Sequence, residues 1–209
     1  MNWVLSPVEV RVLGCLIEKE STTPEYYPLT LNALVNACNQ KSSRDPVVQY
    51  DEDTVARALE LLREKGLTLR ISGAGHRVEK FGHRLGEVLN LGRREMALLC
   101  VLMLRGPQTV GELRGRTERM HDFVDLEEVE EVLRHMAASE GGASTEGPLV
   151  APVPRGRWVH LLGGEAVETE EPEPATAPAP FNLEARVASL EREVESLKEH
   201  FERFRRQFE

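Results

Sequence analysis

The stretch Ser6-Pro-Val-Glu-Val-Arg-Val-Leu-Gly-Cys-Leu-Ile17 has an apolar pattern that returns at residues 92–103, which read Gly-Arg-Arg-Glu-Met-Ala-Leu-Leu-Cys-Val-Leu-Met. Both stretches predict a buried helix, and Cys15 in the first is matched by Cys100 in the second. Two later pairs of segments repeat in the same order: residues 28–34 with 107–113, and residues 51–62 with 125–136. Residues 1–164 therefore contain a weak internal duplication.

Each half then ends in two short strand-like runs around a glycine turn: residues 67–71 and 76–80 in the first half, and residues 149–153 and 157–161 in the second. Capping signals mark three helix starts: Ser6 with Glu9, Thr109 with Glu112, and Asp125 with Glu128. Each half is therefore predicted to run helix, helix, helix, strand, turn, strand, which is the order of a winged helix. The alternative is an unrelated α+β fold with the same order of elements. The recurrence of that order in both halves argues against this alternative.

Composition excludes several classes of protein. The chain has 209 residues, and its longest unbroken apolar run, Met96 to Leu104, is far shorter than the ~20 residues of a membrane span. The amino terminus lacks the pattern of a secretory signal, and the three cysteines form no Cys-x-x-Cys pair. We expect a cytoplasmic protein without a disulfide framework, a metal site or a cofactor, and without a membrane partner.

The net charge of −9 is unevenly distributed, because residues 165–180 alone carry −5. This segment is rich in Pro, Ala and Glu, and we expect it to be a disordered linker. The predicted fold is mainly α with small β wings (α+β), in four parts: residues 1–90 and 91–164 as two winged-helix domains, the linker 165–180, and a coiled-coil helix over 181–209. The acidic total excludes a protein that coats DNA through bulk positive charge.

The last segment has a heptad pattern of apolar residues. They are spaced alternately four and three apart: Leu183, Val187, Leu190, Val194, Leu197, Phe201, Phe204 and Phe208. β-Branched residues at one heptad position with leucine at the other favour a parallel dimer, so we expect a homodimer through this helix. The alternative is an amphipathic helix that folds back on its own domains.

Residues 22–47, which begin Thr-Thr-Pro-Glu-Tyr-Tyr-Pro-Leu-Thr-Leu, and residues 104–120 resemble the YceH family of bacterial proteins. The resemblance covers residues 6–163 and implies two winged-helix domains, often followed by a coiled coil, in a largely uncharacterised family. Asp45 stands where the family leads us to expect Glu, and Ser43 where Asn is common. The family-motif loop contains Asn39, Gln40, Lys41, Arg44 and Pro46.

In a helix-turn-helix, the second helix enters the major groove of DNA. The candidate DNA-reading helix of the first half, residues 51–65, has an exposed face with both acidic and basic side chains. The candidate DNA-reading helix of the second half, residues 125–136, has an acidic exposed face that phosphates would repel. Basic residues lie mostly in loops and wings. The candidate DNA-binding residues are Lys41, Arg44, Arg57, Arg63, His76, Arg77, Lys80, Arg114, Arg116 and Arg119. The alternative is that each pairs with a neighbouring carboxylate on a solvated face.

Two functions follow from these patterns. The first is a regulatory, non-enzymatic protein that binds duplex DNA, and the second is a protein-interaction scaffold that does not bind DNA. No nucleotide-binding or zinc-protease motif occurs in the sequence. Cys38 is the one cysteine in a polar run, but a small buried residue is the more common role of such a cysteine. We therefore expect no enzyme and no catalytic residue.

Overall fold

The computed structural model describes residues 3–71, 78–138 and 147–164, which fall within one compact unit of the chain. In the first half the elements are α1 (Pro7–Thr22), the 3-10 helix η1 (Pro24–Tyr26), β1 (Leu29–Thr30), α2 (Leu31–Cys38), α3 (Glu52–Glu64), β2 (Thr68–Ile71) and β3 (Lys80–His83). A short helix, α4 (Leu85–Leu89), follows. The second half contains α5 (Arg93–Arg105), β4 (Gln108–Thr109), α6 (Val110–Thr117), α7 (Leu126–Ala137), β5 (Val150–Val153), the 3-10 helix η2 (Pro154–Gly156) and β6 (Arg157–His160).

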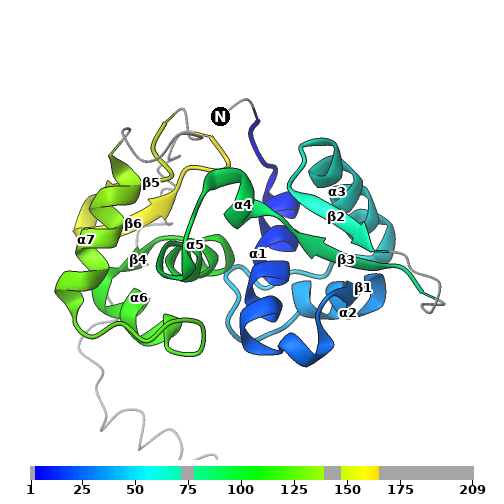
Figure 1. Ribbon diagram of the computed structural model, residues 1–209, viewed down its shortest axis with the longest axis horizontal. Helices are drawn as coiled ribbons and strands as arrows, with labels where there is room; N and C mark the ends of the chain where they lie inside the picture. The colour runs from blue at the N-terminus through cyan, green and yellow to red at the C-terminus, as the bar shows by residue number, and fades with distance from the viewer. Residues whose placement is uncertain (1–2, 72–77, 139–146, 165–209) are drawn as a thin grey trace, which may run out of the picture. The chain divides into compact units, whose positions relative to one another are not determined.

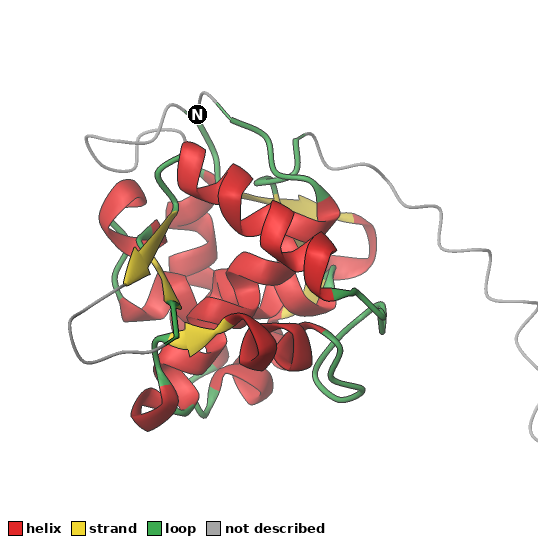
Figure 2. Cartoon of the chain, turned by 90° about the vertical axis from the view of Figure 1, so that its right-hand side faces the viewer, coloured by secondary structure: helices red, strands yellow, loops and turns green. Residues whose placement is uncertain are grey.

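The two halves share one topology (Figure 1). Each forms a three-stranded antiparallel sheet, in the order β1-β3-β2 in the first half and β4-β6-β5 in the second, so the last strand of each half is central. Leu29 is the partner of Phe81 in one sheet, as Gln108 is of Trp158 in the other. Figure 2, which faces the first half, shows how little of the chain is strand beside its helices. The predicted mixed α+β class and the internal duplication are both confirmed.

Short-range signals correctly placed the helix starts. Ser6 and Thr109 form complete capping boxes with Glu9 and Glu112 at the starts of α1 and α6. The carboxylate of Asp125 caps α7 by accepting from the Glu128 backbone N–H at 2.8 Å. These bonds satisfy backbone donors that a helix leaves free in its first turn.

The strand prediction for residues 76–80 was wrong by several positions, because β3 runs over Lys80–His83. Two contacts fix that position. A Cβ added at Gly82 would lie 3.2 Å from the Tyr27 hydroxyl oxygen, and that oxygen accepts a hydrogen bond from the His83 backbone N–H at 2.8 Å. The predicted glycine turn at residues 73–75 lies outside the described residues.

Helices α1 and α5 lie side by side and join the halves (Figure 1). The contact is close at Gly14, where an added Cβ would be 2.9 Å from Leu104 Cδ2. At the same place, the Cys100 thiol donates to the Gly14 carbonyl oxygen at 3.4 Å. The buried apolar residues of both halves form one core. A domain boundary near residue 90 stays a prediction, and the linker and coiled-coil predictions fall on residues beyond those described.

None of the helices within the described ranges is both long and apolar enough to cross a membrane.

Candidate functional site

The loop between α2 and α3 is anchored to α1 by a buried arginine. The Arg44 guanidinium donates to both carboxylate oxygens of Glu18, at 2.9 and 2.6 Å, and to the Ala37 carbonyl oxygen at 3.1 Å. Burial by itself would raise the pKa of Glu18, but the hydrogen bonds and the charge of Arg44 bring that pKa below its ordinary value. The Arg44 side chain is 0% exposed, so Arg44 offers no guanidinium to a phosphate, contrary to its predicted role in contacting DNA.

Four further hydrogen bonds secure the two ends of this loop. Arg11 on α1 donates to the carbonyl oxygen of Cys38 at 3.1 Å and to that of Pro46 at 2.6 Å. The Asn39 amide donates to the Tyr50 carbonyl oxygen at 2.8 Å and accepts from the Tyr50 backbone N–H at the same distance. The family-motif residues Asn39 and Arg44 therefore fix the shape of the loop.

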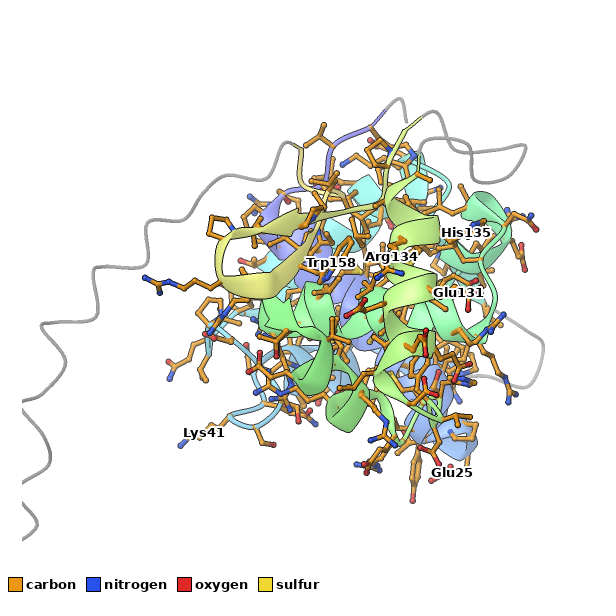
Figure 3. The ribbon with its side chains drawn as sticks, turned by 90° about the vertical axis from the view of Figure 1, so that its left-hand side faces the viewer. Glu25, Lys41, Glu131, Arg134, His135 and Trp158 are labelled. Atoms are coloured by element: carbon orange, nitrogen blue, oxygen red, sulfur yellow. The ribbon has the colours of Figure 1, made fainter. Side chains whose placement is uncertain are left out.

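Lys41 and Cys38, close to that network in the sequence, differ in exposure. Lys41 is exposed and points away from the protein (Figure 3). The Cys38 side chain is buried, and both its hydrogen bond with Cys15 and its burial raise the pKa of its thiol. A thiol held protonated in this way is a poor nucleophile.

The loop also meets the carboxyl end of α5. The Asp45 backbone N–H donates to the Leu104 carbonyl oxygen at 2.9 Å, and Arg105 Nη2 donates to Ser43 Oγ at 2.7 Å. Between the loop, α1, α5 and the end of α6 is a cleft of about 240 Å³. We call it the basic cleft, after the four cations in its lining: Lys19, Arg105, Arg116 and Arg119.

The basic cleft carries an excess of positive charge. Among the described residues its only lining carboxylate is that of Glu18, which already pairs with Arg44 at 2.6 Å and with Lys19 at 3.2 Å. Arg116 pairs with Glu112 at 3.3 Å. For Arg105 and Arg119, no carboxylate oxygen of the described residues lies within 4.0 Å. Burial, with the nearby charges of Arg116 and Arg44, lowers the pKa of Arg105.

Only some of the predicted DNA-binding residues meet at this cleft. Arg116 and Arg119 line it, and Lys41 belongs to the adjoining loop. Arg114 instead holds the segment before α7, donating to the Phe123 and Val124 carbonyl oxygens at 3.2 and 3.0 Å. The remaining candidates lie away from the cleft lining or outside the description: Arg57 and Arg63 on α3, Lys80 on β3, and His76 and Arg77 in the undescribed residues 72–77.

The comparison with protein families gives one match. The model of a family described as "Protein of unknown function, DUF480" matches residues 5–156. The chain belongs to the DUF480 family. It is 56% identical over 209 residues to a UPF0502 protein of Solibacter usitatus, covering 100% of both chains. It is 54% identical over 201 residues to a UPF0502 protein of Opitutus terrae, covering 93% of this chain and 84% of that one.

All four cations of the basic cleft lie inside the segment that the DUF480 model matches. Two of them, Lys19 and Arg105, are absent from the residues predicted to bind DNA. Lys19 stands between Glu18 and Glu20 in the sequence and so resembles part of a neutralised charged run. The one available signal was its place in the last turn of α1, and that signal is weak. Folding is what brings Lys19 to residues about a hundred positions away.

The outer faces of α3 and α7 differ from the cleft in charge. On α3, Arg63 is paired with Glu60 at 2.7 Å, and both side chains are about half exposed. On α7 of this DUF480 chain, Arg134 is paired with Glu130, while Glu131 lies on the outer side of the helix (Figure 3). Neither helix presents a cluster of unpaired cations.

Proposed function

We propose that the chain is a tandem winged-helix protein of the kind implied by its resemblance to the YceH family, and that it binds duplex DNA in a regulatory, non-enzymatic role. Its repeated topology supports this proposal, because three helices followed by a β-hairpin are the elements of a winged helix. The three free cysteines suit the reducing cytoplasm, where we place the protein.

One observation carries the proposal: four cations from three helices and the turn after α6 converge on one cleft. Binding to DNA depends largely on Lys and Arg side chains that neutralise phosphates. Arg105 and Arg119 are suited to this, because no described carboxylate lies within 4.0 Å of either guanidinium. The exposed Lys41 extends the basic surface beyond the cleft.

The proposed contacts are made by the basic cleft and its loop, with neither α3 nor α7 inserted in the major groove. The acidic side chains of α7 would meet phosphates at close range, where like charges cost several kcal/mol. The cations of α3 are few and Arg63 is already paired. Contacts of this kind position a protein on the duplex without reading its sequence.

Fluorescence anisotropy on a duplex at about 50 and about 200 mM salt tests the proposal. We expect affinity to fall steeply with salt for the natural protein. The double variant Arg116→Gln, Arg119→Gln should bind less tightly and have a salt slope smaller by about 2, because each lost phosphate contact removes about 0.9. The matched control is Arg57→Gln, Arg63→Gln on α3. Absence of binding, or an equal loss in both double variants, would overturn the proposal.

We extend the proposal to the carboxyl-terminal segment, whose heptad residues lie outside the described part of the chain. A parallel coiled coil over residues 181–209 would bring two copies of the basic cleft to one DNA molecule. Linked sites raise the effective concentration of the second contact. This supports a dimer as the DNA-binding form.

A second candidate function is a protein-interaction scaffold, and the region around the start of α7 favours it. Val124 is 79% exposed and Leu126 50% exposed, beside the acidic first turn of that helix. Apolar residues in an acidic rim suit a basic, amphipathic partner segment. Capture of one stoichiometric protein after nuclease treatment, lost in Val124→Ser, Leu126→Ser and kept in Arg116→Gln, Arg119→Gln, would support the scaffold over the DNA-binding protein.

A further inference from the structure

We propose that the basic cleft also binds a small metabolite that carries two phosphoryl groups. The cleft is concave and its volume of about 240 Å³ is near the lower end of small-molecule sites. A flat cationic surface would suffice for the outside of a DNA duplex. A hollow of this size instead suits a compact ligand that can be enclosed on several sides.

The wall of the cleft supplies the groups that recognise phosphate. Arg105, Arg116 and Arg119 come from α5, from α6 and from the turn after α6, and guanidinium groups bind phosphate oxygens in pairs. The Ser43 hydroxyl accepts from Arg105 and keeps its own proton to donate. Ser42 adds a second hydroxyl beside it.

The charge of the cleft indicates how many phosphoryl groups it takes. A phosphomonoester carries about −1.5 to −2 at pH 7, so two carry about −3 to −4. Once Glu18 is counted as neutralised by buried Arg44, and Arg116 as paired with Glu112, three of the four cations of the lining remain, which matches the lower end of that range. A single orthophosphate, at about −1.5 to −2, would leave at least one of these cations uncompensated.

The same lining argues against recognition of a nucleobase. In the part of the chain that the structure describes, the apolar lining consists of Cys100, Val101, Leu104 and Met120, and none of the lining residues is aromatic. Stacking on aromatic rings is the common way in which proteins hold a base. We therefore assign the site to the phosphoryl groups of a small ligand, such as a bisphosphorylated sugar or pyrophosphate itself.

Isothermal titration calorimetry of the full chain with inorganic pyrophosphate tests this inference. We expect one site per chain, with orthophosphate and sulfate binding at least tenfold more weakly. Arg116→Gln, Arg119→Gln should weaken pyrophosphate binding at least tenfold, while Arg57→Gln, Arg63→Gln should leave it unchanged. Because Arg116 also pairs with Glu112, a thermal melt accompanies each variant. If the double variant melts early, Arg119→Gln alone replaces it, with a loss of at least threefold expected.

Three results would overturn the inference: no saturable heat with pyrophosphate, sulfate binding equal to pyrophosphate, or an equal loss in the cleft and α3 variants. Competition between pyrophosphate and DNA is a further expectation, and this part alone rests on the proposed function. If pyrophosphate binds and DNA does not, the proposed function fails and the inference stands. If DNA binds and pyrophosphate does not, the inference fails and the proposed function stands.

Discussion

Arg44 and Glu18 form a two-pronged ion pair, with nitrogen–oxygen distances of 2.9 and 2.6 Å, that fastens the loop after α2 to α1. The loop in turn touches the end of α5 and forms one side of the basic cleft. A single buried pair in the first half therefore shapes a surface that the second half completes.

Substitution of Arg44 should destabilise the fold. In Arg44→Gln the Glu18 carboxylate, whose side chain is only 15% exposed, loses its buried partner and keeps only Lys19 at 3.2 Å, and we expect a loss of about 3 kcal/mol in the free energy of unfolding. Urea denaturation measures it. The control is Arg63→Gln, which removes an exposed pair and should cost no more than about 0.5 kcal/mol. Equal losses in the two variants would contradict a structural role for the buried pair.

Stability should depend on the protonation of His160. Burial lowers the pKa of this imidazole to about 4, and its Nδ1 atom has no hydrogen-bond partner within the described structure. The unfolded value is about 6.5, so between these pH values the unfolded state binds more protons. The contribution of neutral His160 to the free energy of unfolding is therefore complete above about pH 6.5 and is lost as the pH falls toward 4.

Urea denaturation of His160→Phe between about pH 7.5 and 5 checks this expectation, because phenylalanine keeps the ring and cannot titrate. The fall in unfolding free energy over that range should be smaller than in the natural protein. His135→Gln, on the exposed face of α7, serves as the control and should keep the natural slope. If the unfolding free energy of His160→Phe depends on pH as in the natural protein, groups other than His160 cause the loss of stability in acid.

The contact between α1 and α5 should be intolerant of a methyl group. Gly14→Ala places Cβ about 2.9 Å from Leu104 Cδ2, and we expect a loss of about 1–3 kcal/mol from overpacking. Gly115→Ala on α6 is the matched control, since nothing beyond its chain neighbours and the backbone of its own helix lies within 4 Å of the added Cβ. That variant should be more stable by up to about 1 kcal/mol, because alanine favours a helix over glycine. Thermal melts followed by circular dichroism distinguish the opposite signs.

Removal of residues 181–209 should lower the oligomeric state and leave the fold of the remaining chain intact. The heptad residues all lie in that segment, and the buried residues described in the two halves form a core of their own. Light scattering at tens of micromolar, about where coiled-coil association is expected, measures the change. A full-length chain that is already monomeric under these conditions would contradict the proposed dimer.

Features that depend on near neighbours in the chain were predictable from the sequence. Ser6 and Thr109 indicate where their helices begin, because each side chain accepts a hydrogen bond from the backbone N–H three residues later. The amphipathic α3 and α7 are recognisable because their buried residues recur with the period of a helix. The duplication was visible for the same reason, since each half repeats these local patterns.

Features that depend on residues far apart in the chain could not be predicted from the sequence. The two-residue strands β1 and β4 carry no alternation of their own and exist only through pairing with β3 and β6. Arginine is usually a surface residue, and the burial of Arg44 depends on Glu18 on α1 and on the Ala37 carbonyl oxygen, neither of which a local pattern relates to it. The basic cleft joins Lys19 with Arg119, and no local pattern relates two such positions.

The packing of Gly14 against Leu104 has a consequence for biosynthesis. The ribosome releases α1 long before α5. In a nascent chain, the side of α1 that packs on α5 therefore stays uncovered until about ninety more residues have emerged. A fragment that ends before Arg93 keeps that side uncovered permanently. Expression of the first half by itself should therefore yield an aggregation-prone polypeptide that depends on chaperones. Extending that fragment through Arg105 should reduce its aggregation.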